Sequence, residues 1–545
     1  MGVKCSTPAN NSCGELFSAD ASTVARSRSR SRSISTPTPT PTPMTPTRTW
    51  KLPPYHLGAR LGPRANLNLI LVTTTLVNFL DLFQLSSVLF GLPDIREALG
   101  FTTDDLNWVL IVYNITFAAF LLIAGQLGQK LGLEKTFIAG TSILTVSNII
   151  NTAAPNKAAL IAGRAISGIG AGLTAPNGLA ILSRTFPDGD ARNKALAVYT
   201  ACAPLGSTIG TVIGSLLASS SAGWRSIFWV CLILTGLAMV MACLFLPAFP
   251  KDKDIPIDIP GTIVFTAGVA LLVYGLNDSS RIGWTAPSVL VGIILGVCLL
   301  GVFVFVETRV SNPAIPKYLW KSLPFFLMLV AVFAFGGSFS SWFFISTQLC
   351  VNLLRYTPVL TAVYFLPAAF SAIASGAFSA PMVKFLGEKG TLVIGLGVTA
   401  AGAVAWAFAT PARAGGTGHG EGYWYSIVAA IIFVCGSPVA MVPAQSVLLR
   451  QVEAGNHAVA SALFNTAYQV GASVLLAGAN ALMDGNQETV GGMTMVSMDG
   501  YRNAFWLLTG VVGAAAVVVA VCYWPRKGEG PRADGQQEEM VEAKN

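Results

Sequence analysis

Charged residues are scarce in this chain, and their scarcity excludes most soluble folds. Asp, Glu, Lys and Arg make up 11% of the 545 residues, hydrophobic residues make up 53%, and the mean hydropathy is +0.61. A soluble protein carries roughly 25% charged residues. Apolar runs of roughly 20 residues, the length of a membrane-spanning helix, recur along the chain instead. Because these runs are continuous, a barrel of alternating strands is disfavoured. They predict fourteen spans, at about 67–91, 107–126, 136–154, 158–183, 195–218, 226–247, 261–277, 287–306, 323–346, 359–383, 390–410, 425–447, 457–483 and 503–523. Two longer connections, 410–426 and 484–503, are glycine-rich and polar and predict flexible surface loops.

The motifs of common enzyme chemistry are also missing. The sequence has no Cys-x-x-Cys pair and no phosphate-binding Gly-x-x-x-x-Gly-Lys-Ser/Thr loop, and its three histidines are far apart. We therefore expect no metal, no cofactor, no direct use of ATP and no enzyme activity. Most of the nine cysteines lie in apolar runs, where we interpret them as small packing residues. These are Cys202, Cys231, Cys243, Cys298, Cys435 and Cys522.

Basic residues predict the orientation in the membrane. Between the predicted spans, thirteen Lys and Arg residues fall in loops on the side of the termini and seven fall in loops on the opposite side. Because positive residues accumulate in cytosolic loops, both termini are predicted to be cytosolic. Residues 1–64 hold an Arg-Ser repeat and then Thr-Pro repeats, which together with 524–545 predict disordered cytosolic tails. The net charge of +8 belongs to tails and loops, so we expect no nucleic-acid partner.

Two ionisable residues interrupt the apolar runs. Asp81 lies in the first predicted span and Arg164 in the fourth, and counting along each helix places both in the outer half of the membrane. Ionisable groups at that depth are costly and are functional-site candidates by default. We interpret them as a proton-coupling pair, in which Asp81 takes up a proton and Arg164 adjusts its affinity for that proton. The alternatives are an Asp81 that only fixes packing through permanent hydrogen bonds, and an Arg164 tied to a backbone carbonyl.

Glycine is concentrated in two further places. The loop 125–135 reads Gly-Gln-Leu-Gly-Gln-Lys-Leu-Gly-Leu-Glu-Lys, and its glycines allow a tight turn between the second and third spans. In the fifth span, Gly206, Gly210 and Gly214 are four residues apart and share one helix face. Such a face lets a neighbouring helix approach closely. Generic packing of small residues would produce the same series.

Together these features resemble the major facilitator superfamily. The resemblance covers about 66–525 and rests on Leu80-Asp81 with Leu92-Pro93-Asp94-Ile95, on the loop 125–135, on Arg164 through Gly172, and on the glycine series. Within the superfamily, the chain is most similar to the fourteen-span drug:proton antiporters common in fungi. It is more weakly similar to the aminotriazole-resistance or borate-exporter subgroup. The implied fold is all-α and integral to the membrane, with two six-helix halves at 65–250 and 311–523 and a two-helix insertion at 251–310.

The resemblance also implies roles for the glycine-rich segments. The loop 125–135 would gate the transporter through Gly125, Gly128, Gln129, Lys130, Gly132 and Lys135. Gln129 stands where the family usually has Asp, so the contact at this gate is expected to be weaker and uncharged. The fifth span resembles the antiporter signature through Pro204, Gly206, Gly210 and Gly214. Thr211 replaces the signature's Pro and Ser215 replaces its second Gly, so a displaced helix bend is expected and the match to the antiporter signature is incomplete.

Aromatic and amide side chains predict a substrate cavity near the middle of the membrane, between the two halves. As a group with few charges they suit a neutral, amphipathic or weakly cationic cargo, although a single aromatic is more often a packing residue. The predicted cavity residues are Tyr113, Trp342, Phe343, Tyr364, Gln445, Asn465 and Gln469.

These features predict a proton-coupled secondary transporter that exports small organic molecules by alternating access. Its expected partners are a small-molecule substrate, protons and membrane lipid, and we expect a monomer in the plasma membrane, with the vacuolar membrane as the alternative. Three other functions stay open: uptake or uniport of a nutrient, export of an inorganic anion such as borate, and a receptor that does not transport. A channel is disfavoured because no ring of charges or filter sequence is visible.

Overall fold

The computed structural model describes residues 63–186, 189–218, 220–249, 258–310, 313–354, 356, 358–408, 422–490 and 493–524. The predictions for the two tails lie outside these ranges except at their inner ends. The same holds for most of the predicted loop 410–426 and for the basic residues Lys251 and Lys253.

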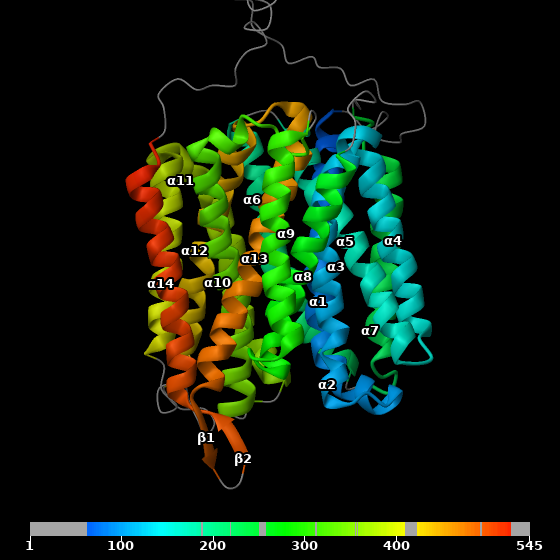
Figure 1. Ribbon diagram of the computed structural model, residues 1–545, viewed down its shortest axis with the longest axis vertical. Helices are drawn as coiled ribbons and strands as arrows, with labels where there is room; N and C mark the ends of the chain where they lie inside the picture. The colour runs from blue at the N-terminus through cyan, green and yellow to red at the C-terminus, as the bar shows by residue number, and fades with distance from the viewer. Residues whose placement is uncertain are drawn as a thin grey trace, which may run out of the picture. The chain divides into compact units, whose positions relative to one another are not determined.

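Helices make up almost all of the described chain (Figure 1). They are α1 (Pro63–Leu99), α2 (Thr103–Leu106), α3 (Trp108–Leu131), α4 (Leu133–Ala153), α5 (Lys157–Thr185), α6 (Asp190–Ala218), α7 (Arg225–Phe245), α8 (Ile259–Ile282), α9 (Pro287–Arg309), α10 (Leu323–Gln348), α11 (Pro358–Ala407), α12 (Gly422–Arg450), α13 (His457–Asp484) and α14 (Met498–Cys522).

Each predicted span falls on one of these helices, and twelve of the helices are long and apolar enough to cross a membrane. The count of twelve differs from fourteen for two reasons. Helix α4 has 21 residues but is not among the twelve. The predicted spans 359–383 and 390–410 both fall on α11, which is interrupted at Gly387 by a backbone φ of 72°. That left-handed conformation favours glycine, so Gly387 separates two helical segments.

A β-hairpin lies in a region that the sequence predicted to be a flexible loop. Strands β1 (Gln487–Val490) and β2 (Met493–Val496) pair antiparallel between α13 and α14 (Figure 1). The prediction was wrong here because it relied on glycine and polar content. The β-branched and apolar residues Thr489, Val490 and Val496 flank the glycines and favour paired strands.

The helices pack as two groups that are joined by α8 and α9. The first helix group comprises α1 and α3 to α7, and the second comprises α10 to α14. The groups meet where α3 packs on α13 and where α6 packs on α11 and α12. Helix α8 contacts both α3 and α13, and α9 packs on α8, so this pair lies along the seam between the groups (Figure 1).

A turn at Gly132 marks one end of the helix bundle, and a turn at Asn156 marks the other. At the Gly132 end, Gly132 adopts a φ of 105° and separates α3 from α4. At the Asn156 end, the Asn156 side chain caps α5 by accepting a hydrogen bond from the backbone N–H of Ala159. Helix α1 begins and α14 ends at the Gly132 end, whereas the β-hairpin lies at the Asn156 end (Figure 1).

Candidate functional site

The two predicted ionisable residues are brought together by a third side chain. Asp81 on α1 and Arg164 on α5 both contact Tyr113 on α3. The Tyr113 hydroxyl donates a hydrogen bond to the Asp81 carboxylate, and the Arg164 guanidinium carbon lies 4.5 Å from the centre of the Tyr113 ring. Tyr113 was predicted to line the substrate cavity. The structure instead places it as the bridge between the two charges.

Burial raises the free-energy cost of keeping Asp81 and Arg164 charged. Arg164 is fully buried, with 0% of its surface exposed, and Asp81 is 9% exposed. The Arg164 Nε donates to the backbone oxygen of Val109 at 3.0 Å, which is the contact expected for a purely structural arginine. Within the described part of the chain, however, its two terminal nitrogens have no hydrogen-bond partner. A buried cation with two unused donors is costly inside a membrane.

The glycine series on α6 packs directly against α1, the helix that carries Asp81. A Cβ atom added to Gly206 would lie 2.3 Å from the Phe79 oxygen, and one added to Gly210 would lie 2.5 Å from the Phe83 oxygen. Gly214 meets Ser87 in the same way, at 2.5 Å from its Cα. The backbones of α1 and α6 therefore touch along three helical turns, and only glycine permits this approach.

The glycine-rich loop joins the two helix groups at the Gly132 end. The Gln129 Nε2 donates to Asn456 Oδ1 at 2.8 Å and to the Gly455 oxygen at 3.2 Å. Arg184, near the end of α5, donates to the same Gly455 oxygen at 2.9 Å. Gln129 thus contributes an uncharged contact to the segment just before α13.

The other loop residues differ in their surroundings. Gly125 packs on α13, where an added Cβ would lie 3.0 Å from the Ala458 oxygen. Gly128 packs on Asn177 of α5, with only 2.0 Å between an added Cβ and Asn177 Oδ1. Lys130 is half-buried and Lys135 is exposed.

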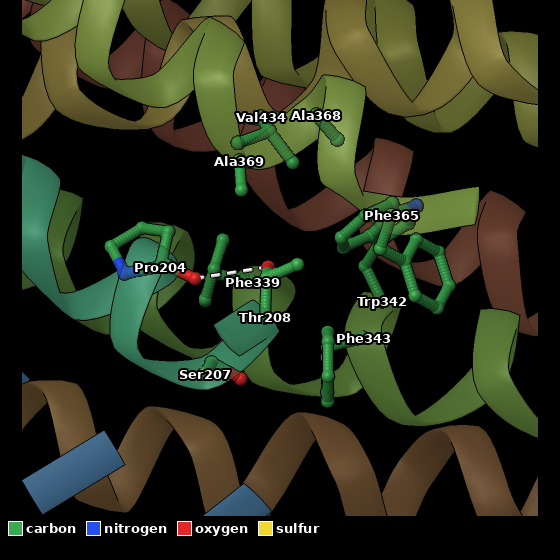
Figure 2. Close-up of a pocket in the computed structure, with 10 residues that line it drawn as sticks. All are labelled: Pro204, Ser207, Thr208, Phe339, Trp342, Phe343, Phe365, Ala368, Ala369 and Val434. Atoms are coloured by element: carbon green, nitrogen blue, oxygen red, sulfur yellow. Dashed lines mark hydrogen bonds between the residues drawn. The ribbon is translucent and has the colours of Figure 1, made fainter. Parts of the chain in front are cut away.

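A small pocket lies between α6 of the first group and α10, α11 and α12 of the second (Figure 2). Ten residues line it, and none of them is charged: Pro204, Ser207, Thr208, Phe339, Trp342, Phe343, Phe365, Ala368, Ala369 and Val434. The Thr208 hydroxyl donates to the Pro204 oxygen at 3.0 Å, so it is turned back onto its own helix.

Of the predicted cavity residues, Trp342 and Phe343 line this pocket, together with Pro204 from the predicted antiporter-type helix. Tyr364 is buried against Phe365, and Gln445 accepts a hydrogen bond from Thr200. Asn465 donates to a backbone oxygen of its own helix, and Gln469 is half-buried outside the pocket lining. The prediction missed Phe339 and Phe365, although Phe339 is one helical turn before Phe343 and shares its face.

The pocket is backed by stacked aromatic rings of the second group. Trp342 stacks on Phe433 with 4.8 Å between ring centres, and Trp406 stacks on Phe505 with 5.5 Å. Trp342 also packs edge-on against Phe365. These contacts fix the orientation of the Trp342 ring, whereas Phe343 is half-buried and stands at the edge of the cluster.

Two groups of membrane-length helices that meet around an aromatic pocket are the architecture of a membrane transporter. Residues 74–475 match the model of the Major Facilitator Superfamily, and the chain belongs to this family. The predicted all-α fold of this superfamily is thereby confirmed, and the protein is a multi-pass membrane protein rather than an enzyme.

Its relatives include proteins named for multidrug transport or resistance. The chain is 71% identical to "Major facilitator superfamily multidrug transporter mfsC" of Aspergillus fumigatus over 89% of its own length and 93% of that protein. It is 26% identical to "Multidrug resistance protein Stp" of Mycobacterium tuberculosis over 74% of each chain. The human organic anion transporter MFSD10 has a similar fold, with a TM-score of 0.60 and 15% identity over 83% of this chain and 99% of that one.

Proposed function

We propose that this protein exports small organic molecules, including drugs, in exchange for protons. The similarity to multidrug transporters supports efflux of organic compounds. The observation that carries the proton-coupled part is the buried contact of Asp81 with Tyr113 beside Arg164. A carboxylate so placed can bind and release a proton inside the membrane, and its neighbours respond to the change of charge.

The pocket supports an uncharged or amphipathic aromatic cargo. Phe339, Trp342 and Phe343 offer ring faces and edges, and Ser207 offers a hydroxyl. Aromatic walls with few polar groups are typical of small-molecule sites. Export of an inorganic anion such as borate is less well supported, because none of the residues lining the pocket carries a positive charge.

Ser207 offers a physical connection between cargo and proton. Its hydroxyl lies 2.7 Å from the Ser86 hydroxyl on α1, so a pocket-lining side chain of α6 contacts the helix that carries Asp81. The glycine contacts hold these two helices together. A shift of α1 on protonation of Asp81 would therefore move one wall of the pocket.

The contacts between helix groups support alternating access. Besides the Gln129 and Arg184 contacts, Ser183 Oγ lies 2.9 Å from His457 Nδ1, also at the Gly132 end. These hydrogen bonds hold the two groups together at that end. We place the Gly132 end in the cytosol, with both termini, so that this conformation is closed toward the cytosol. Opening requires these contacts between the two groups to break.

The finer organisation belongs to the same proposal. We assign fourteen spans, counting α4 and both segments of α11. The halves are 65–250 and 311–523, and the insertion is 251–310. We propose a monomer in the plasma membrane.

Transport by inverted membrane vesicles tests this function. Vesicles containing the full chain are given a panel of amphipathic dyes, azoles and borate, with and without an acid interior. Accumulation of an organic compound that needs the gradient supports proton-coupled export. Accumulation that ignores the gradient would leave a facilitator and remove the proton role of Asp81.

A further inference from the structure

The first helix group contains buried polar side chains that the proposed exchange does not yet use. They lie between α1, α4, α5 and α7 and form a cluster of six: Gln84, Ser147, Asn148, Asn151, Ser167 and Thr235. None is more than 2% exposed. We call this set the polar cluster.

Hydrogen bonds connect the polar cluster across helices. Asn151 donates to Ser167 at 3.2 Å, and Ser167 lies 2.8 Å from Ser147. Asn148 reaches both Gln84 on α1 and Thr235 on α7, each at 3.4 Å. That distance is at the long limit for a hydrogen bond, so the Asn148 amide is only loosely held.

The polar cluster leaves polar atoms unused. Within the described residues, Gln84 Nε2, Asn148 Oδ1 and Asn151 Oδ1 are buried without a hydrogen-bond partner, as are the two terminal nitrogens of Arg164. Buried polar groups are almost always paired, with protein or with ordered water. Donors and acceptors are both present, which suits water and excludes a site built only for a cation.

The polar cluster extends from the charged site to a surface turn. Gln84 is one helical turn from Asp81 on α1, and Ser167 is one turn from Arg164 on α5. At the other side, Asn151 is in the last turn of α4, next to the exposed residues Ala153 and Asn156. The aromatic pocket is lined by other helices, α6 and α10 to α12.

We infer that ordered waters fill the polar cluster and carry protons between the α4–α5 turn and Asp81, by a route separate from the aromatic pocket. The inference rests on the proposed proton exchange. A hydronium ion at the turn passes its proton along the waters to the Asp81 carboxylate, which becomes a carboxylic acid, and one water is left at the turn. Arg164 keeps its charge throughout. With Asp81 neutral, that charge favours release of the proton.

The presence of water is tested first, on the purified full chain. X-ray radiolysis of bound water labels side chains nearby, even when they are buried. Tyr113 lies within the charged site, so we expect it to be labelled in the wild type. In Asn148→Leu, which puts an apolar side chain into the polar cluster, labelling should fall several-fold. An unlabelled Tyr113 in the wild type would mean that the region is dry, and the inference would be wrong.

Proton delivery is tested next, by the rate of gradient-driven exchange. Asn148→Leu should slow exchange about tenfold, leave KM for the cargo unchanged and shift the pH profile so that more acid is needed. Asn148→Ser, which keeps a polar group and room for water, should restore the rate. Ser142→Ala is the control, because within the described chain Ser142 on α4 donates to the backbone oxygen of Ile138 in its own helix. If Asn148→Leu does not fold, Thr235→Val tests the same point.

The outcomes separate this inference from the function on which it depends. Labelled Tyr113 with unchanged exchange in Asn148→Leu would make the waters structural and overturn the proton route alone. A wild type whose transport ignores the gradient would overturn the proposed function and the route with it. The labelling result would still decide whether water is present.

Discussion

The two helix groups belong to one bundle but differ in the charged and aromatic side chains that they bury. The first group buries Asp81, Arg164 and a cluster of amides and hydroxyls, whereas the second buries stacked aromatic rings such as Trp342, Trp406 and Phe433. Polar interiors hold water and charge, and aromatic interiors hold apolar surfaces. In the proposed function, the first group would therefore handle protons and the second would provide most of the surface for cargo.

Removing the Asp81 charge from the first group is the strongest test of this difference between the two groups. Asp81→Asn keeps the size and a hydrogen-bonding side chain but cannot exchange a proton at neutral pH. We expect gradient-driven export to fall to the background of empty vesicles, with normal expression and folding. The measurement is uptake by inverted vesicles at several pH values.

Glu97→Gln provides the matched control for that variant. Glu97 is on the same helix but is exposed near its end. Its removal should leave export unchanged. Full export by Asp81→Asn would contradict the assignment of the proton site.

The contact between α1 and α6 should be sensitive to a single methyl group. In Gly210→Ala, the new Cβ would lie 2.5 Å from the Phe83 oxygen, so the two helices must separate. Overpacking of this kind costs about 1–3 kcal/mol. We expect a lower midpoint of thermal unfolding in detergent and slower transport.

Gly510→Ala is the comparison for this prediction, because nothing lies within 4 Å of a Cβ added there. Alanine favours helix over glycine by about 1 kcal/mol in water, so this variant should be neutral or slightly more stable. Equal effects of the two substitutions would argue against a tight α1–α6 contact.

A substitution in the aromatic pocket should weaken cargo binding and leave proton coupling unchanged. Phe343→Ala removes one ring from the lining, which is worth about 1 kcal/mol, or about fivefold in apparent affinity. KM for an aromatic dye should rise, and the pH dependence of transport should keep its shape. Phe326→Ala, on the exposed face of the same helix α10, should change neither. A shifted pH profile in Phe343→Ala would mean that the two interiors are not separate.

The smallest effect is expected at the contact between the groups. Gln129→Ala removes uncharged hydrogen bonds to Asn456 and Gly455, worth about 1 kcal/mol. The conformation open at the Gly132 end should then be populated about fivefold more. Distances between spin labels on the loop 125–135 and on the segment before α13 report this change. Lys194→Gln, at an exposed position near the start of α6, should leave the distances as they are.

The sequence allowed most of the fold to be predicted because each span is encoded locally, by its own apolar run. Asp81 and Arg164 were also visible locally, as charges in apolar surroundings. The contact of Tyr113 with both charges could not be predicted, because the sequence of a span does not show which side chains of other helices an aromatic residue contacts. The pocket needed knowledge of which helices meet, so Phe339 and Phe365 were missed and Tyr364 and Gln445 were included.

One signal in the sequence could have been used further. Helix α4 is not among the twelve helices that are apolar enough to cross a membrane, and it carries Ser147, Asn148 and Asn151 on one face. Polar residues in a predicted span of low apolar content are candidates for a buried hydrogen-bond network between helices. Their partners on α1, α5 and α7 still required the structure, since no spacing rule connects separate helices.

The most direct test of the division between the two groups measures proton movement and cargo binding in the same sample. Purified Asp81→Asn in liposomes with a trapped pH dye is given a fluorescent amphipathic cargo. We expect the cargo still to bind, with an affinity that no longer depends on pH, while the proton movement that it triggers in the wild type disappears. Loss of cargo binding together with proton movement, in a protein that remains folded, would show that Asp81 belongs to the cargo site and would contradict the separation.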